Sequence, residues 1–151
     1  MAKVIFMSNK TAKKADEAPD RREFFRLNFK SPLNFRSYSL KAALKPVPAP
    51  KKEKGVSQNI SASGVLFQIQ NNPPRVSSVL WMNLDIRTLK ICQEIEKRAL
   101  IFNNGILGRV VRVEEDPAKI NAYNVGVCFI TQEQKRAKEI ERILSQISQS
   151  K

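Results

Sequence analysis

The stretch "NISASGVLFQI", Asn59 to Ile69, decides the fold. In its second half, Val65, Phe67 and Ile69 fall on one side of the chain, with the period of two that is typical of a β-strand with one buried face. Its first half contains small polar residues and ends in Gly64, a residue type that permits a positive φ or a close approach of the backbone. The stretch therefore predicts a strand that is entered through a serine-rich turn.

Short alternating segments predict further strands on both sides of this one. The expected strands are Phe25–Lys30, with a continuation through Leu33, Phe35 and Tyr38 after Pro32, then Val76–Ile86, Ile106–Glu115 and Tyr123–Ile130. Turn residues separate several of them, at Asn71–Pro74, Asn103–Gly105 and Asp116–Pro117. Some six short antiparallel strands favour a small β-barrel.

The end of the chain changes to a helical pattern. Thr131 with Gln134 three residues later fits a capping box, and apolar residues follow at helical spacing. We therefore expect strands to about residue 130 and an amphipathic helix over residues 131–148. The fold class is all-β with a C-terminal helix, in one domain over residues 21–148, preceded by a flexible basic tail over residues 1–20.

Two segments have a different character. Lys45–Lys54 contains three prolines among lysines, which predicts an extended, solvated connection. Arg87–Phe102 is compatible with a short helix and also with a pair of strands, and the sequence leaves both open.

Composition narrows the function. The chain of 151 residues has 27 Lys and Arg against 14 Asp and Glu, a formal charge of +13 that attracts polyanions, nucleotides or an acidic membrane surface. It has no histidine and only two cysteines, so neither a metal site nor catalytic residues are expected, and an enzyme is disfavoured. We expect no membrane span, no secretory signal and a cytoplasmic location, because apolar runs are short.

A cluster of arginines precedes the first expected strand. The segment "RREFFR" contains Arg21, Arg22 and Arg26. A guanidinium is always charged, matches phosphate oxygens or the O6 and N7 edge of guanine with a fork of donors, and stacks on purines. Asn59 and Ser61 of the later stretch add small donors and acceptors. The two segments together suit a purine nucleotide.

The two motifs, in this order, resemble the PilZ domain, a bacterial receptor family for the second messenger cyclic di-GMP. The family's RxxxR motif reads Arg22-Glu-Phe-Phe-Arg26, and its (D/N)xSxxG motif reads Asn59-Ile-Ser61-Ala-Ser-Gly64. The resemblance covers roughly residues 21–145. It implies a six-stranded antiparallel PilZ-type β-barrel with a C-terminal helix, in which the arginine loop folds over the strand that carries the second motif.

The same resemblance implies the roles of the site residues. Arg22 and Arg26 would clamp guanine and phosphate, with Arg21 as an auxiliary contact. Asn59 and Ser61 would hydrogen-bond a guanine edge or phosphate, and Gly64 would leave room for the ligand. Cyclic di-GMP is then the ligand, and no cofactor is expected.

The resulting hypothesis is a non-enzymatic cyclic di-GMP receptor that signals to a downstream protein partner when its arginine loop becomes ordered. One alternative is a basic barrel that binds RNA or single-stranded DNA, which the low aromatic share of 7% makes less favoured. Another is a PilZ-like adaptor without a ligand.

Two further side chains are interpreted as structural. Arg112 alternates with valines and could either face solvent or border the ligand, and solvent is favoured. Cys128, between Val127 and Phe129, is expected to be partly buried and unreactive, because no base is available to activate it.

Overall fold

The fold is that of a computed structural model, which describes residues 27–38 and 50–149. The predicted basic tail, residues 1–20, lies outside the described residues. So do Arg21, Arg22 and Arg26, and the first half of the proline-containing connection.

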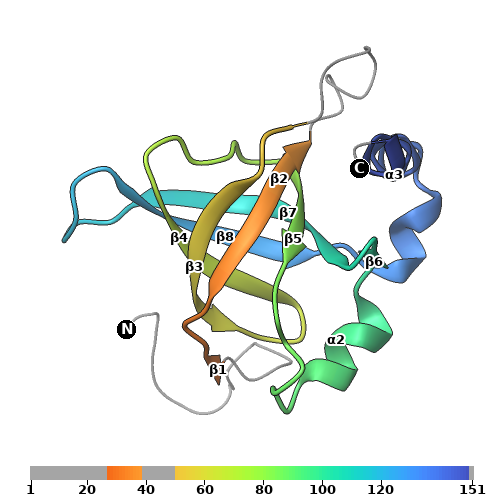
Figure 1. Ribbon diagram of the computed structural model, residues 1–151, viewed down its shortest axis with the longest axis horizontal. Coiled ribbons are helices and arrows are strands. Elements are labelled where there is room, and N and C mark those ends of the chain that lie inside the picture. The colour runs from red at the N-terminus through yellow and green to blue at the C-terminus, as the bar shows by residue number, and fades with distance from the viewer. Residues whose placement is uncertain (1–26, 39–49, 150–151) are drawn as a thin grey trace, which may run out of the picture.

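Six strands close into an antiparallel barrel, as the sequence predicted (Figure 1). Around the ring, β3 pairs with β2, β2 with β5, β5 with β7, β7 with β8, β8 with β4, and β4 again with β3. Two short strands are added, β1 beside β3 and β6 beside β7. The strands are β1 (Leu27–Asn28), β2 (Pro32–Tyr38), β3 (Glu53–Ile60), β4 (Gly64–Gln70), β5 (Val79–Asn83), β6 (Ile101–Phe102), β7 (Gly105–Glu115) and β8 (Ala122–Phe129).

The barrel interior is filled by alternate residues of the six strands. Phe35 on β2 and Phe67 on β4 meet at its centre with ring centroids 5.1 Å apart, and both are fully buried. A tilted aromatic pair of this kind adds about 0.5–1.5 kcal/mol beyond the area that it buries. The alternation that predicted β4 is therefore the same feature that builds the core.

Strand β3 was not predicted. The sequence assigned residues up to Lys54 to a solvated connection, whereas the strand already begins at Glu53. Two of its three buried positions carry Gly55 and Ser57 in place of large apolar side chains, and the third is Ile60. The strand thus lacks the hydrophobic alternation on which the prediction relied.

For the segment Arg87–Phe102, the sequence left open a short helix or a pair of strands, and the structure contains both a helix and a strand. Helix α2 (Cys92–Arg98) covers its middle, and the two-residue strand β6 ends it. Asn103 and Asn104 then have φ of 52° and 63°, as a type I′ hairpin turn requires, which agrees with the predicted turn.

The C-terminal helix begins later than predicted. The Thr131–Gln134 capping box is present, but it caps a short 3₁₀ helix, η1 (Gln132–Arg136). The backbone is extended at Ala137, with φ −63° and ψ 138°, and α3 (Lys138–Gln149) starts after it. A single helix over residues 131–148 is therefore wrong at its start.

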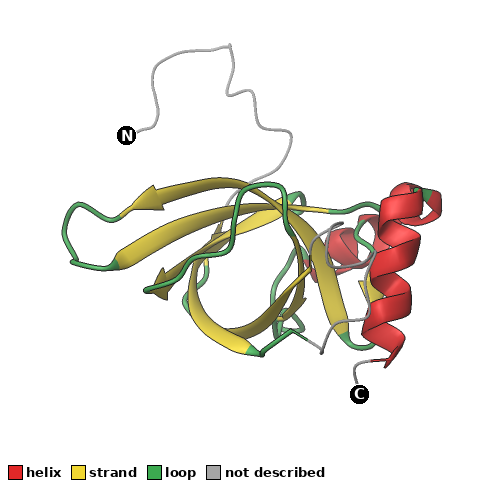
Figure 2. Ribbon diagram, turned by 90° about the horizontal axis from the view of Figure 1, so that it is seen from above, coloured by secondary structure: helices red, strands yellow, loops and turns green. Residues whose placement is uncertain are grey.

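Helices α2 and α3 lie on one side of the barrel, and the β7–β8 hairpin extends on the opposite side (Figure 2). The buried face of α3 packs outside the barrel against β2, β5 and β7, in a second apolar cluster that includes Tyr38, Val79, Leu107, Ile140 and Ile143. Glu139 on α3 also pairs with Arg109 on β7, with 2.5 Å between Oε1 and Nη2. In the described ranges, no helix is both long and apolar enough to span a bilayer.

Candidate functional site

The polar stretch that opens the sequence analysis is the turn between β3 and β4. Asn59 is the next-to-last residue of β3, Ile60 ends that strand, and Gly64 begins β4. The Ser61 N–H donates to the Gly64 carbonyl at 2.9 Å, and the Ser63 N–H donates to Ser61 Oγ at 3.2 Å. Ser61 is only 7% exposed, so its hydroxyl holds the shape of this turn.

Gly64 is required by the approach of a neighbouring strand. A Cβ atom on this residue would lie 2.2 Å from the carbonyl oxygen of Val127 on β8. No glycine among the described residues has a positive φ, so a close backbone approach is the reason for glycine here. The absence of a side chain at Gly64 thus serves the pairing of β4 with β8, a role distinct from leaving room for a ligand.

A pocket of about 270 Å³ opens beside this turn. Three of the predicted site residues, Asn59, Ser61 and Gly64, line it together. The remaining lining comes from the turn, β4, β7 and β8, and consists of Ser63, Val65, Leu66, Val111, Arg112, Gly126, Val127 and Cys128. The three predicted arginines lie outside the described residues, so their position relative to the pocket stays a prediction.

Arg112 is exposed to solvent, as expected, and it also lines the pocket, which was the alternative that the sequence left open. A β-bulge between Val110 and Arg112 interrupts the alternation of β7, which the sequence treated as regular. Arg112 pairs with Gly126 on β8, and its Nε lies 3.8 Å from where a Cβ of that glycine would be. The guanidinium therefore lies over a glycine at the pocket, and it is the one charged group among the described lining residues.

Cys128 was misjudged, since it is exposed and lines the same pocket. It stands opposite Gly64 in the β4–β8 pairing. Its apolar neighbours Val127 and Phe129 point into the protein, and strand alternation turns Cys128 outward. The alternation of apolar residues on β8 was the signal that could have predicted this exposure.

Strand β1 connects the predicted arginine segment to this pocket. Leu27 pairs with Ile60 and Asn28 pairs with Asn59, which lines the pocket. The fully buried Ser57 fixes this register, because its hydroxyl donates to the Phe29 carbonyl. The described chain therefore begins at the edge of the pocket.

Within residues 27–38 and 50–149, no group of three or more His, Cys, Asp or Glu side chains is placed to hold a metal ion. The pocket offers hydroxyls, an amide, a thiol, a guanidinium and apolar strand residues. These groups can hydrogen-bond and neutralise a polar, anionic ligand.

The chain matches a model of a known protein family. The PilZ domain model matches residues 20–146, which includes both sequence motifs and all the barrel strands. No curated protein matches the chain.

Solved structures with a similar chain trace have low sequence identity. The inhibitor of motility MotI from Bacillus subtilis has 14% identity and a TM-score of 0.49, and the match covers 87% of this chain and 54% of that one. The PilZ domain of YcgR from Escherichia coli, solved with c-di-GMP, has 12% identity and a TM-score of 0.43, with 85% and 88% covered. The chain thus spans about half the length of MotI and most of the YcgR domain.

Proposed function

Since the chain belongs to the PilZ domain family, we propose that it is a non-enzymatic receptor for cyclic di-GMP. The dinucleotide would lie in the pocket beside the β3–β4 turn, held by Asn59 and Ser61 from one side. Arg22 and Arg26 would hold guanine and phosphate groups from the other side, with Arg21 as an auxiliary contact. Binding would order the arginine segment against the barrel and so change the surface that a partner protein meets.

The observation that carries the proposal is the pairing of β1 with the end of β3. Leu27 lies opposite Ile60, the residue before Ser61. Arg26 precedes Leu27 by one peptide bond, and consecutive Cα atoms are about 3.8 Å apart. The last residue of the RxxxR segment is therefore bonded directly to a strand that pairs with the second motif, which supports the proposal that both motifs serve one site.

Arg112 extends the proposed site beyond the two motifs. It adds a positive charge to a pocket whose other described lining residues are uncharged. Its Nε is 3.6 Å from Glu114 Oε1, and its side chain is 54% exposed, so a ligand phosphate can reach it without breaking a buried interaction. Cyclic di-GMP carries two phosphates, which favours several cations around the site.

Isothermal titration of nucleotide-free protein with cyclic di-GMP tests the proposal. We expect saturable binding at micromolar or lower concentration. Arg26→Ala should weaken it by about tenfold or more, because a hydrogen bond to a charged group contributes about 1.5–3 kcal/mol. Arg142→Ala removes an equal charge from the exposed face of α3 and should change little. Absence of binding heat in the wild type, or equal loss in both variants, would contradict the proposal.

The wider functional context follows from this role. A receptor for a second messenger acts in the cytoplasm, where we propose that the protein works, and it needs a downstream protein partner.

A further inference from the structure

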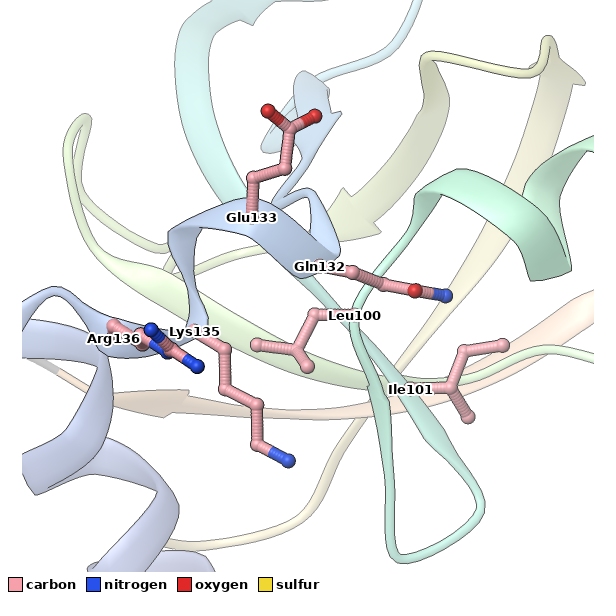
Figure 3. Close-up of a pocket in the computed structure, with 6 residues that line it drawn as sticks. All are labelled: Leu100, Ile101, Gln132, Glu133, Lys135 and Arg136. Carbon is pink, nitrogen blue, oxygen red and sulfur yellow. The ribbon is translucent and has the colours of Figure 1, made fainter.

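A second, larger cavity lies away from the candidate site. Its volume is about 610 Å³, and it is formed between η1 and the junction of α2 with β6 (Figure 3). Its lining residues are Leu100, Ile101, Gln132, Glu133, Lys135 and Arg136, none of which lines the pocket beside the β3–β4 turn. We call this cavity the η1 groove.

Hydrogen bonds fix both walls of the η1 groove. The Leu100 N–H donates to the Ile130 carbonyl at 2.7 Å, which attaches the α2–β6 junction to the end of β8. Gln132 Nε2 donates to the Glu96 carbonyl at 3.0 Å, at the C-terminal end of α2. The capping box of Thr131 and Gln134 holds η1. The groove is therefore preformed, so a partner would not bear the entropic cost of ordering it.

The η1 groove combines apolar and cationic groups. Ile101 is 41% exposed beside the buried Leu100, which gives the groove an apolar floor open to solvent. Lys135 and Arg136 are exposed, and neither has an ion pair with another residue in the described part of the chain. Figure 3 shows the Glu133 side chain directed away from both. Two cations against the single carboxylate of Glu133 give the groove a net positive charge next to exposed hydrocarbon.

The combination of apolar and charged lining residues favours a protein segment over a small molecule as the ligand of the groove. Small-molecule sites are predominantly apolar and bury most of their ligand. Here two of the six lining side chains are hydrocarbon and the others are polar or charged. An apolar anchor flanked by complementary charges is instead typical of protein interfaces, where the anchor gives affinity and the charges give specificity.

The η1 groove is joined to the candidate site through the end of β8. The Phe129 N–H donates to the Ser63 carbonyl at 2.8 Å, in the turn beside the candidate pocket. The next residue, Ile130, accepts from the Leu100 N–H in the groove wall. Two successive residues thus connect the polar turn with the groove through backbone hydrogen bonds.

From these observations we propose that the η1 groove is the docking site for an acidic segment of a partner protein. An Asp- or Glu-containing segment would place an apolar side chain against Leu100 and Ile101 while its carboxylates pair with Lys135 and Arg136. The assignment of this segment to a signalling partner rests on the proposed receptor function, whereas the groove and its charge do not.

A random peptide library displayed on phage, selected on wild type and counter-selected on a Lys135→Glu, Arg136→Glu double variant, tests this inference. We expect the surviving peptides to contain Asp or Glu next to Leu, Ile or Phe. Synthetic copies should bind wild type and lose about tenfold or more in affinity on the double variant, which is about 1.4 kcal/mol or more. A Lys51→Glu, Lys52→Glu control makes the same charge change at exposed residues outside the groove and should keep binding.

Three outcomes would overturn the inference: no peptide survives the counter-selection, the survivors lack acidic residues, or the control variant loses binding equally. If the charge reversals lower the melting temperature, Ile101→Ala replaces them, since removal of a partly exposed side chain should also weaken the peptides. Titration with cyclic di-GMP separates the two proposals. The double variant should bind the dinucleotide normally, and peptide binding without dinucleotide binding would remove the receptor function while keeping the groove.

Discussion

The hydroxyl of Ser57 on β3 donates a hydrogen bond to the carbonyl of Phe29, just after β1. The Oγ atom of Ser57 also accepts a hydrogen bond from the Ser31 N–H at 3.0 Å. One fully buried serine therefore holds the bend between β1 and β2 against β3. Because β1 is the described segment nearest to the RxxxR motif, Ser57 also fixes where the chain reaches the candidate pocket.

Ser57→Ala should destabilise the protein and weaken ligand binding together. The substitution leaves the partly buried Phe29 carbonyl and Ser31 N–H without this partner, which costs up to about 1–3 kcal/mol. Urea denaturation measures the loss of stability, and calorimetry measures the affinity for cyclic di-GMP. Ser37→Ala is the control, because this half-buried serine on β2 has no side-chain hydrogen bond within the described ranges. Unchanged affinity in Ser57→Ala would show that ligand binding does not depend on the hydrogen bonds by which Ser57 holds β1 in register with β3.

Gly64→Ala should destabilise the barrel, whereas Gly126→Ala should be tolerated. The added Cβ would lie 2.2 Å from the Val127 carbonyl oxygen in the first case, so β4 and β8 must move apart. Overpacking of this kind costs about 1–3 kcal/mol. In the second case the nearest atom is Arg112 Cβ at 3.6 Å, an ordinary contact. Thermal unfolding of the two variants makes the comparison, and equal melting temperatures would show that the strands adapt.

Arg112→Ala should reduce affinity for cyclic di-GMP without loss of stability. The side chain is 54% exposed, and its contact with Glu114 at 3.6 Å is a surface ion pair of little energetic value. Loss of a charge-assisted hydrogen bond to phosphate would lower affinity by about tenfold or more. Glu114→Gln is the control, which keeps Arg112 and removes its competitor. Affinity that falls equally in Glu114→Gln would mean that the ion pair itself is needed.

The sequence predicted the barrel well because its strands alternate clearly. Val65, Phe67 and Ile69 all point into the core as expected, and the Asn103–Asn104 turn has the positive φ values of the predicted hairpin. The prediction of strands failed where buried positions of a strand are not occupied by hydrophobic side chains. Strand β3 has Gly55 and Ser57 at buried positions, and hydrogen bonding by a buried hydroxyl leaves no trace in a hydrophobic pattern.

The sequence predicted the part of the candidate site that comes from the β3–β4 turn, but not the part that comes from β7. Asn59, Ser61 and Gly64 are adjacent in sequence, and the structure brings them together in one pocket. Arg112 comes from β7, and a bulge changes its direction, which the sequence does not reveal. The break at Ala137 that divides η1 from α3 is similar, because the capping box at Thr131 and the apolar spacing from Ala137 onward predict one helix, whereas the backbone is extended at Ala137.

Ile143→Ala should cost about 2–5 kcal/mol of stability, and Ile120→Ala almost none. Ile143 on α3 is fully buried in the cluster that attaches this helix to the outside of the barrel. Ile120 is 90% exposed in the loop between β7 and β8. Denaturation of the two variants measures the change in unfolding free energy when the same atoms are removed from a buried and from an exposed isoleucine. A small loss in Ile143→Ala would show that α3 contributes little to the stability of the barrel.

Alkylation of the two cysteines should report directly on the candidate pocket. Cys128 is exposed in the pocket lining, whereas desolvation at the half-buried Cys92 raises the pKa of that thiol, with a further contribution from Glu96. Because the thiolate is the reactive form, iodoacetamide at mildly alkaline pH should modify Cys128 faster than Cys92. Cyclic di-GMP bound beside Gly64, the pairing partner of Cys128, should slow alkylation of Cys128 and leave Cys92 unchanged. Mass spectrometry of the digested protein measures both rates in one sample, so Cys92 serves as the internal control. Binding of the dinucleotide without protection of Cys128 would place the ligand elsewhere on the barrel.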